Sequence, residues 1–114
     1  MLKPDAAQPG APPSVAEIFS ALGDPTRLGL LTRLSNGGAC SITRLSADSS
    51  LTRQAVTKHL GVLQRAGLVS RRHVGRESLF RYEPQSLGQA RAYLDQVSAQ
   101  WDAALARLQA FVED

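Results

Sequence analysis

The stretch TRQAVTKHLGVL, residues 52–63, decides the fold that this sequence predicts. Val56, Leu60 and Leu63 recur at the spacing of one helical face, which predicts an amphipathic helix with a buried apolar stripe. The opposite face holds only polar or small residues, with two cations and no acid: Arg53, Gln54, Thr57, Lys58, Gly61 and Gln64. Because Arg and Gln suit base edges, one interpretation places this helix in a DNA major groove. The other is an ordinary amphipathic helix with a solvated face.

Charge is distributed unevenly along the 114 residues, which carry +3 overall. Residues 1–43 are neutral, with three Lys/Arg and three Asp/Glu. Residues 44–81 carry eight Lys/Arg against two acids, a net +6, and residues 82–114 carry two Arg against five acids, a net −3. A basic middle segment predicts an anionic partner for that segment alone, although many basic surfaces bind nothing specific. The length fits one domain with a modest core.

The first residues and the cysteine content bear on cellular location. Residues 1–13 hold four prolines and a glycine, which predicts a disordered arm without an apolar signal core. Cys40 is the single cysteine, so no intrachain disulfide is possible and a reducing cytoplasm is the simplest location. No apolar run approaches the length of a membrane span, so no membrane partner is expected.

Two helices are expected between the arm and the middle of the chain. Ser14 and Glu17 form a capping-box pattern for a first helix that ends at Gly23. Its apolar residues keep helical spacing: Val15, Ile18, Phe19 and Leu22. Asp24-Pro25 is a strong helix start, and residues 36–38, Asn-Gly-Gly, end the second helix. Its predicted stripe is Leu28, Leu31 and Leu34, with Leu30 beside it.

A short third helix and a hairpin are expected on either side of residues 52–63. Ser41 can cap the short helix, which contains Ile42 and Leu45. Residues 68–74 and 77–82 surround Gly75-Arg76 and predict a β-hairpin. Five basic side chains crowd this hairpin: Arg71, Arg72, His73, Arg76 and Arg81. They suit a phosphate backbone; the alternative is a solvated hairpin whose arginines protect a sheet edge.

The last helix is expected to run from Pro84 to about Val112. One apolar row recurs every seven residues: Leu87, Leu94, Trp101 and Leu108. A second row consists of Ala90, Val97, Ala104 and Phe111. Two such rows predict a seam for another helix, and the small domain makes a partner chain the more natural occupant. The predicted dimer interface comprises Val15, Ile18 and Phe19 of the first helix with Leu87, Leu94, Val97, Trp101, Leu105, Leu108 and Phe111.

Together these elements predict a mainly α-helical, winged helix-turn-helix domain over residues 14–114. The order is helix, helix, short helix, helix, β-hairpin, long helix, with dimerisation through the terminal helices. Residues 52–66 would enter the major groove of double-stranded DNA, and the wing, residues 68–82, would lie on the backbone or minor groove. The alternative is a winged-helix interaction module that pairs with another chain through residues 87–111.

Several motifs together resemble the ArsR family of bacterial winged-helix transcriptional regulators. They are LGDPTRLGLL (22–31), LTRQAVTKHLGVLQRAGLV (51–69), VGRESLFRY (74–82) and the aromatic Trp101 in the closing helix. The resemblance covers about residues 14–112. It implies a homodimer on an imperfect palindrome, usually a repressor that a small-molecule or protein effector releases. The implied base-contacting residues are Arg53, Gln54, Thr57 and Lys58, with His59 at the edge; the wing contributes Arg76, with Arg71, Arg72 and Arg81 beside it. Thr52 and His73 are further candidates for contacts to the DNA backbone, and a half-buried packing role is an equal alternative for His59.

The sequence departs from the metal-sensing members of that family. Those members place a cysteine pair in the third helix or Asp/His pairs in the last helix. Here Cys40 stands alone before the third helix and the last helix has no histidine, so the chain resembles the metal-independent branch. We expect no metal or cofactor, and Cys40 fits a small buried side chain better than a sensor. Ser49 replaces a usual apolar residue near the end of the third helix. No motif supports an enzyme.

Overall fold

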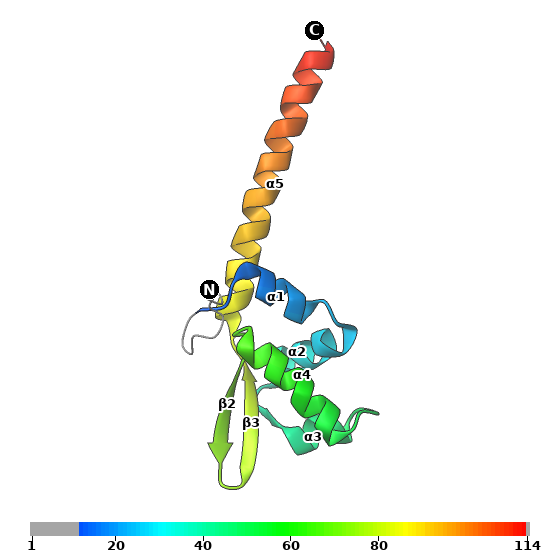
Figure 1. The fold of residues 1–114 in the computed structure, drawn as a ribbon, viewed down its shortest axis with the longest axis vertical. Coiled ribbons are helices and arrows are strands. Elements are labelled where there is room, and N and C mark those ends of the chain that lie inside the picture. Colours follow the sequence, from blue (N-terminus) through cyan, green and yellow to red (C-terminus); the bar gives the residue numbers. More distant parts are fainter. Residues whose placement is uncertain (1–11, 114) are drawn as a thin grey trace, which may run out of the picture.

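The computed structural model describes residues 12–113, which form five helices and a three-stranded antiparallel sheet (Figure 1). The elements are α1 (Val15–Leu22), α2 (Pro25–Gly37), β1 (Cys40–Ser41), α3 (Ile42–Ala47), α4 (Arg53–Arg65), β2 (Val69–Val74), β3 (Glu77–Tyr82) and α5 (Pro84–Glu113). The predicted helix order and hairpin are confirmed. Residues 1–11 of the predicted arm lie outside the described residues.

Side-chain caps set the starts of the first four helices. Ser14 and Glu17 form the predicted capping box, with hydrogen bonds of 3.1 and 2.8 Å. Asp24, Ser41 and Thr52 each accept from the backbone N–H three residues later, at 3.0 to 3.1 Å. Each cap satisfies a donor that the first helical turn leaves unpaired. α3 ends at Ala47, so Ser49 lies beyond the helix, where it is exposed.

The core lies where α1, α2, α3 and α4 meet one face of the sheet. Its largest fully buried side chains are Phe80, Ile18, Leu34, Leu45, Leu60, Leu63, Leu68 and Val56. The predicted stripe on α2 was partly wrong, because Leu28 is 46% exposed whereas Leu30 is buried. At about 100° per residue, residues 30, 31 and 34 share one arc of the helix and Leu28 falls outside it.

The sheet contains one strand more than the sequence predicted. The hairpin pairs Val69 with Tyr82 through to Val74 with Glu77, and Gly75 in its turn adopts a φ of 63°. β1 adds to the other edge of β3, with Cys40 opposite Phe80 and Ser41 opposite Leu79. β1 has only two residues, too few to show the alternation of apolar and polar side chains that identifies a strand, so it could not be found from the sequence. Its pairing ties the start of α3 to the wing.

α5 extends far beyond the rest of the fold. Its 30 residues span about 45 Å at 1.5 Å per residue, in a molecule whose longest dimension is 69 Å. Only its first turns pack on the domain, where Ala90 is buried and the Phe19 and Tyr93 ring centroids are 6.0 Å apart. Figure 1 shows the rest of the helix projecting away from the other elements. Within residues 12–113, no helix combines the length and apolar character needed to cross a membrane.

Substitution of two leucines of α2 tests which side of this helix belongs to the core. Leu34 is 1% exposed, so Leu34→Ala should lower the free energy of unfolding by about 2–5 kcal/mol. Leu28→Ala makes the same change on the same helix and should cost less than about 1 kcal/mol, because nearly half of Leu28 is already in water. Urea denaturation at one protein concentration measures both values. Equal losses would show that Leu28 belongs to the core.

Candidate nucleic-acid interface

α3 and α4 form the predicted helix-turn-helix, joined by residues 48–52. Leu45 of α3 lies in one core cluster with the buried stripe of α4, which fixes the two helices against each other. The stripe covers one side of α4, so the opposite side faces solvent. The structure brings four predicted residues together on that exposed side: Arg53, Gln54, Thr57 and Lys58. They present hydrogen-bond donors and two positive charges, with no carboxylate among them.

Local contacts order part of this surface. The Arg53 guanidinium donates to Thr43 Oγ1 at 2.7 Å, which holds it against α3. The Thr57 hydroxyl donates to the Arg53 backbone carbonyl at 2.8 Å. Gln54 and Lys58 have no side-chain hydrogen bond or ion pair to any residue in the described part of the chain. These two side chains can therefore reach an external partner without breaking a contact of the fold.

Arg27 of α2 links three helices and orients α4. Its guanidinium donates to the carbonyls of Ala21 and Ser20, at 2.8 and 3.3 Å, and lies 3.4 Å from His59 Nδ1. His59 is half-buried against α2, also 3.9 Å from the Asp24 carboxylate. Of the two roles that the sequence left open for His59, these contacts favour packing against α2 over a contact at the edge of the DNA surface. Because α4 turns about 100° per residue, His59 lies on the side opposite Gln54 and Thr57.

Asp24 is the charged group at the start of α2. Its carboxylate accepts the backbone N–H of Arg27, which lowers the pKa of Asp24 below its ordinary value against the opposing effect of burial. The charges of Arg27 and His59 lower the pKa further. Asp24 is therefore ionised at neutral pH, which also suits the positive end of the helix dipole.

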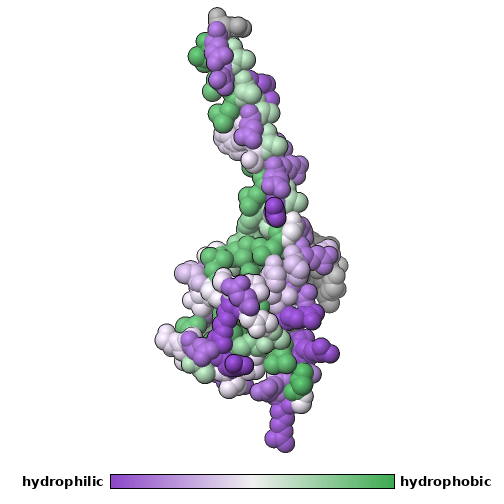
Figure 2. Space-filling model, turned by 180° about the vertical axis from the view of Figure 1, so that it is seen from behind, coloured by the Kyte–Doolittle hydropathy of each residue, from purple (hydrophilic) through white to green (hydrophobic). Residues whose placement is uncertain are grey.

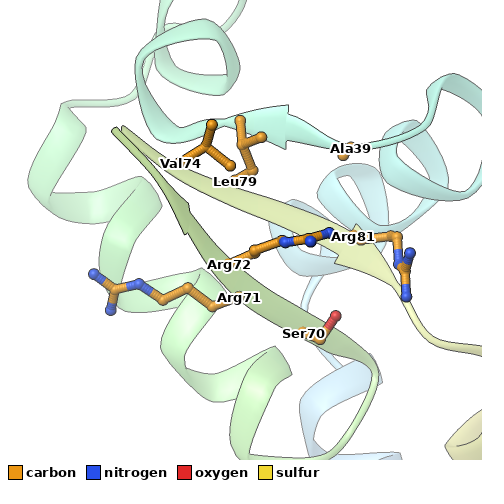
Figure 3. Close-up of a pocket in the computed structure, with 7 residues that line it drawn as sticks. All are labelled: Ala39, Ser70, Arg71, Arg72, Val74, Leu79 and Arg81. Atoms are coloured by element: carbon orange, nitrogen blue, oxygen red, sulfur yellow. The ribbon is translucent and has the colours of Figure 1, made fainter. Parts of the chain in front are cut away.

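The wing divides its cations between two faces of the sheet. Strand alternation and the hairpin register place Arg71 and His73 on the face of buried Phe80, whereas Arg72 and Arg81 lie on the opposite face. Figure 3 shows Arg71 pointing away from Arg72 and Arg81. The sequence alone groups all five basic residues of the hairpin as one cationic surface. The strand alternation instead divides the four strand residues between two faces. Arg76 lies in the turn, at the tip of the wing.

Contacts within the hairpin hold two of these arginines. Arg71 donates to Ser78 Oγ at 3.0 and 3.2 Å and lies 5.8 Å from the centre of the Phe80 ring. Arg81, at the end of β3 far from the turn, pairs with Glu83 at 3.4 Å. The Ser70 hydroxyl, which donates to Glu83 at 2.6 Å, and the Arg81 charge together hold the pKa of Glu83 below its ordinary value. Arg81 is therefore paired and remote from the tip.

Comparison with known proteins decides the family. A family model described as a helix-turn-helix domain matches residues 22–72. The uncharacterized HTH-type transcriptional regulator YuzN of Bacillus subtilis is 43% identical over 75 residues, which are 59% of this chain and 82% of that protein. The solved structure of an ArsR-like transcriptional regulator from Rhodococcus sp. RHA1 is 37% identical, with a TM-score of 0.75, over 82% of this chain and 88% of that one. The chain belongs to the ArsR family.

This ArsR-family protein is a DNA-binding, helix-turn-helix transcriptional regulator. A relative from Synechocystis sp., named transcriptional repressor SmtB homolog, is 40% identical over 62 residues, which are 54% of this chain and 46% of that protein. The family resemblance found in the sequence is confirmed. The longest of the motifs that carry it, residues 51–69, contains α4. Sequence reasoning missed Arg65, which is exposed on the same side of α4, seven residues after Lys58. That spacing of two helical turns was the available indication.

The ArsR-family chain exposes five of the ten residues predicted for its dimer interface. Along α5 the apolar side chains of Leu94, Leu105, Leu108 and Phe111 are exposed, and Trp101 is 65% exposed. Figure 2 shows the corresponding hydrophobic patches along this helix. One predicted residue is corrected, because Ile18 is completely buried in the core. Leu87, like Phe19, is partly buried and packs against that core. Val15, Phe19 and Val97 are half-buried.

Cys40 lies in the short strand β1 and is buried, as expected for a small apolar side chain. The Arg33 guanidinium is 3.8 Å from its sulfur and also pairs with Asp48 after α3. Within residues 12–113, no group of three or more His, Cys, Asp or Glu side chains is placed to hold a metal ion. Cys40 thus contributes to packing between α2, α3 and the sheet.

Proposed function

We propose that this regulator binds an imperfect palindrome as a homodimer, with α4 in the major groove, and represses transcription until an effector releases it. The exposed side of α4 is the observation that carries the proposal. It presents Gln54 and Lys58 without internal partners and Arg53 braced by Thr43. In a helix-turn-helix the first turns of this helix contact base edges. Arg53, Gln54, Thr57 and Lys58 are therefore the proposed base-contacting residues.

The wing supplies contacts to the DNA backbone in this proposal. Arg71 and His73 lie on the face of the sheet that packs toward the helices, and Arg76 lies at the tip. Phosphate contacts fix register on the duplex and carry little sequence information. Thr52, at the start of α4, can add a further phosphate contact. Arg72 and Arg81 lie on the other face of the wing and are not part of the proposed contact.

The exposed apolar face of α5 supports the homodimer. Leu94, Trp101, Leu105, Leu108 and Phe111 would lose their solvent exposure against a second copy, and this burial is favourable. Half-buried Val15, Phe19 and Val97 adjoin the same surface. A dimer also supplies the two-fold symmetry that a palindromic site requires. The name of the Synechocystis relative, a transcriptional repressor, supports repression as the direction of control.

Dimerisation can be tested with charged substitutions on α5. The double variant Leu94→Glu, Trp101→Glu should sediment as a monomer and lose DNA binding, because two carboxylates would be desolvated in the apolar seam. Ala92→Glu, Ala99→Glu places the same charges on the opposite side of this helix and should remain dimeric. Circular dichroism establishes that both variants are folded. Sedimentation of the wild type as a clean monomer at micromolar concentration would instead favour pairing with a different chain.

We also propose that DNA binding is independent of metal, as in the metal-independent branch of the family. Cys40 is buried and lacks a second thiol partner in its own chain. Affinity for the operator should therefore be unchanged by a chelator or by added Zn²⁺ or Cu⁺, and Cys40→Ser should behave as the wild type. Gel-shift titrations measure this. A stoichiometric metal response that Cys40→Ser abolishes would contradict the proposal.

A salt titration of DNA affinity separates base contacts from backbone contacts. The affinity is measured on two duplexes: the operator, located by footprinting upstream of the protein's own coding sequence, and a scrambled version of it. Gln54→Ala should remove about 1–3 kcal/mol of discrimination and weaken operator binding far more than scrambled binding. Arg71→Ala should weaken both similarly and lower the slope of log K against log salt by about one. Arg72→Ala, on the opposite face, is the matched control and should change the slope less. If Gln54→Ala weakens both duplexes equally, α4 does not select the sequence.

A further inference from the structure

The outer face of the wing carries a shallow hollow that the proposed DNA contacts do not use. It has a volume of about 280 Å³ and is lined by Ala39, Ser70, Arg71, Arg72, Val74, Leu79 and Arg81. Leu79 lies at its centre, opposite Ser41 of β1 and opposite Arg72 of β2 in the sheet register. Figure 3 shows Val74 beside Leu79, with Arg72 directed along the sheet toward Arg81. The hollow therefore has an apolar end and a cationic end.

The apolar end is unusual for an exposed face of a small sheet. Val74 is 51% exposed, and half-buried Leu79 also lines the hollow. A row of phosphates would gain nothing from covering these side chains. An apolar ligand chain would gain free energy roughly in proportion to the area that it removes from water.

The cationic end has charge available for a ligand. Arg72 forms no hydrogen bond or ion pair with any residue of the described chain. Arg81 pairs only with Glu83 at 3.4 Å, and that carboxylate already accepts the Ser70 hydroxyl at 2.6 Å. Glu77 shares this face but stands opposite Val74, next to the turn, and does not line the hollow. Two guanidinium groups thus stand at one end, and the one acid that pairs with either of them within residues 12–113 is Glu83.

We propose that this hollow binds a small monocarboxylate with an unbranched apolar chain. The carboxylate would accept hydrogen bonds from Arg72 and Arg81, whose planar donors match its geometry. The chain would lie over Leu79 toward Val74. At about 30 Å³ per non-hydrogen atom, the share of one water in the liquid, the volume of 280 Å³ holds about nine such atoms, close to the ten of octanoate. Octanoate has this size and is the probe.

The location of the hollow gives the ligand a route to the helix-turn-helix. Leu79 pairs with Ser41, and the Ser41 side chain caps α3 through the backbone N–H of Arg44 at 3.1 Å. A ligand on this face contacts the wing directly, and Leu79 beneath it is paired across the sheet with Ser41, the residue that caps α3. It leaves the exposed side of α4 free. The site is thus suited to an effector that binds without occupying the DNA-contacting surface.

Titration of the ¹⁵N-labelled full-length protein with octanoate tests the site without DNA. Backbone amide shifts should concentrate in residues 70–81 and give a dissociation constant on the order of 1 mM, as expected for ten atoms on an open surface. Octanol has the chain without the charge, and inorganic phosphate has the charge without the chain; both should bind about tenfold more weakly. Butanoate should bind more weakly than octanoate, because it covers less of Leu79 and Val74.

Two arginines of the wing, one inside the hollow and one outside it, give a matched pair of variants. Arg72→Gln should weaken octanoate binding about tenfold, the effect of one charge-assisted hydrogen bond. Arg76→Gln removes the same charge from the turn of the wing, outside the hollow, and should leave the affinity unchanged. Equal binding of octanoate and octanol, equal effects of the two variants, or shifts confined to α5 or to the surface around Leu28 and Leu87 would each overturn the proposal.

Discussion

The burial of one side of α4 is the constraint on which the rest of this structure depends. Val56, Leu60 and Leu63 are completely covered by the core, so the helix cannot rotate about its axis without exposing apolar surface. A helix that buries one stripe presents its opposite side in a fixed direction. The side that bears Gln54 and Lys58 is therefore oriented by packing, with no contact of its own needed to hold it.

Arg27 connects this packing to the rest of the fold through polar contacts. It closes the end of α1 by donating to the Ala21 and Ser20 carbonyls, and it reaches His59 on the inner side of α4. Because α1 also packs on α5 through the Phe19–Tyr93 pair, the long helix and α4 share one rigid frame. A second copy held along α5 would thus place its own α4 in a defined orientation, which a palindromic site requires.

The sequence by itself determined the features that depend on a few neighbouring residues. The helix starts at Ser14, Asp24, Ser41 and Thr52 follow from local caps, and the hairpin follows from Gly75 between two strand-like runs. The buried and exposed sides of α4 follow from period alone. These predictions succeeded because caps and periods involve residues within one or two turns of each other. The resemblance to the ArsR family was also visible in such short motifs.

Only the tertiary structure decided which sides of the other elements face the core. Ile18 has the same apolar character as the exposed residues of α5, yet it is buried in the domain's own core, and Leu87 packs partly buried against that core. β1 becomes a strand only because β3 lies beside it, and His59 turns inward because Arg27 and Asp24 meet it there. The two faces of the wing separate through the hairpin register. Each outcome depends on contacts between segments distant in the chain, which composition and periodicity do not encode.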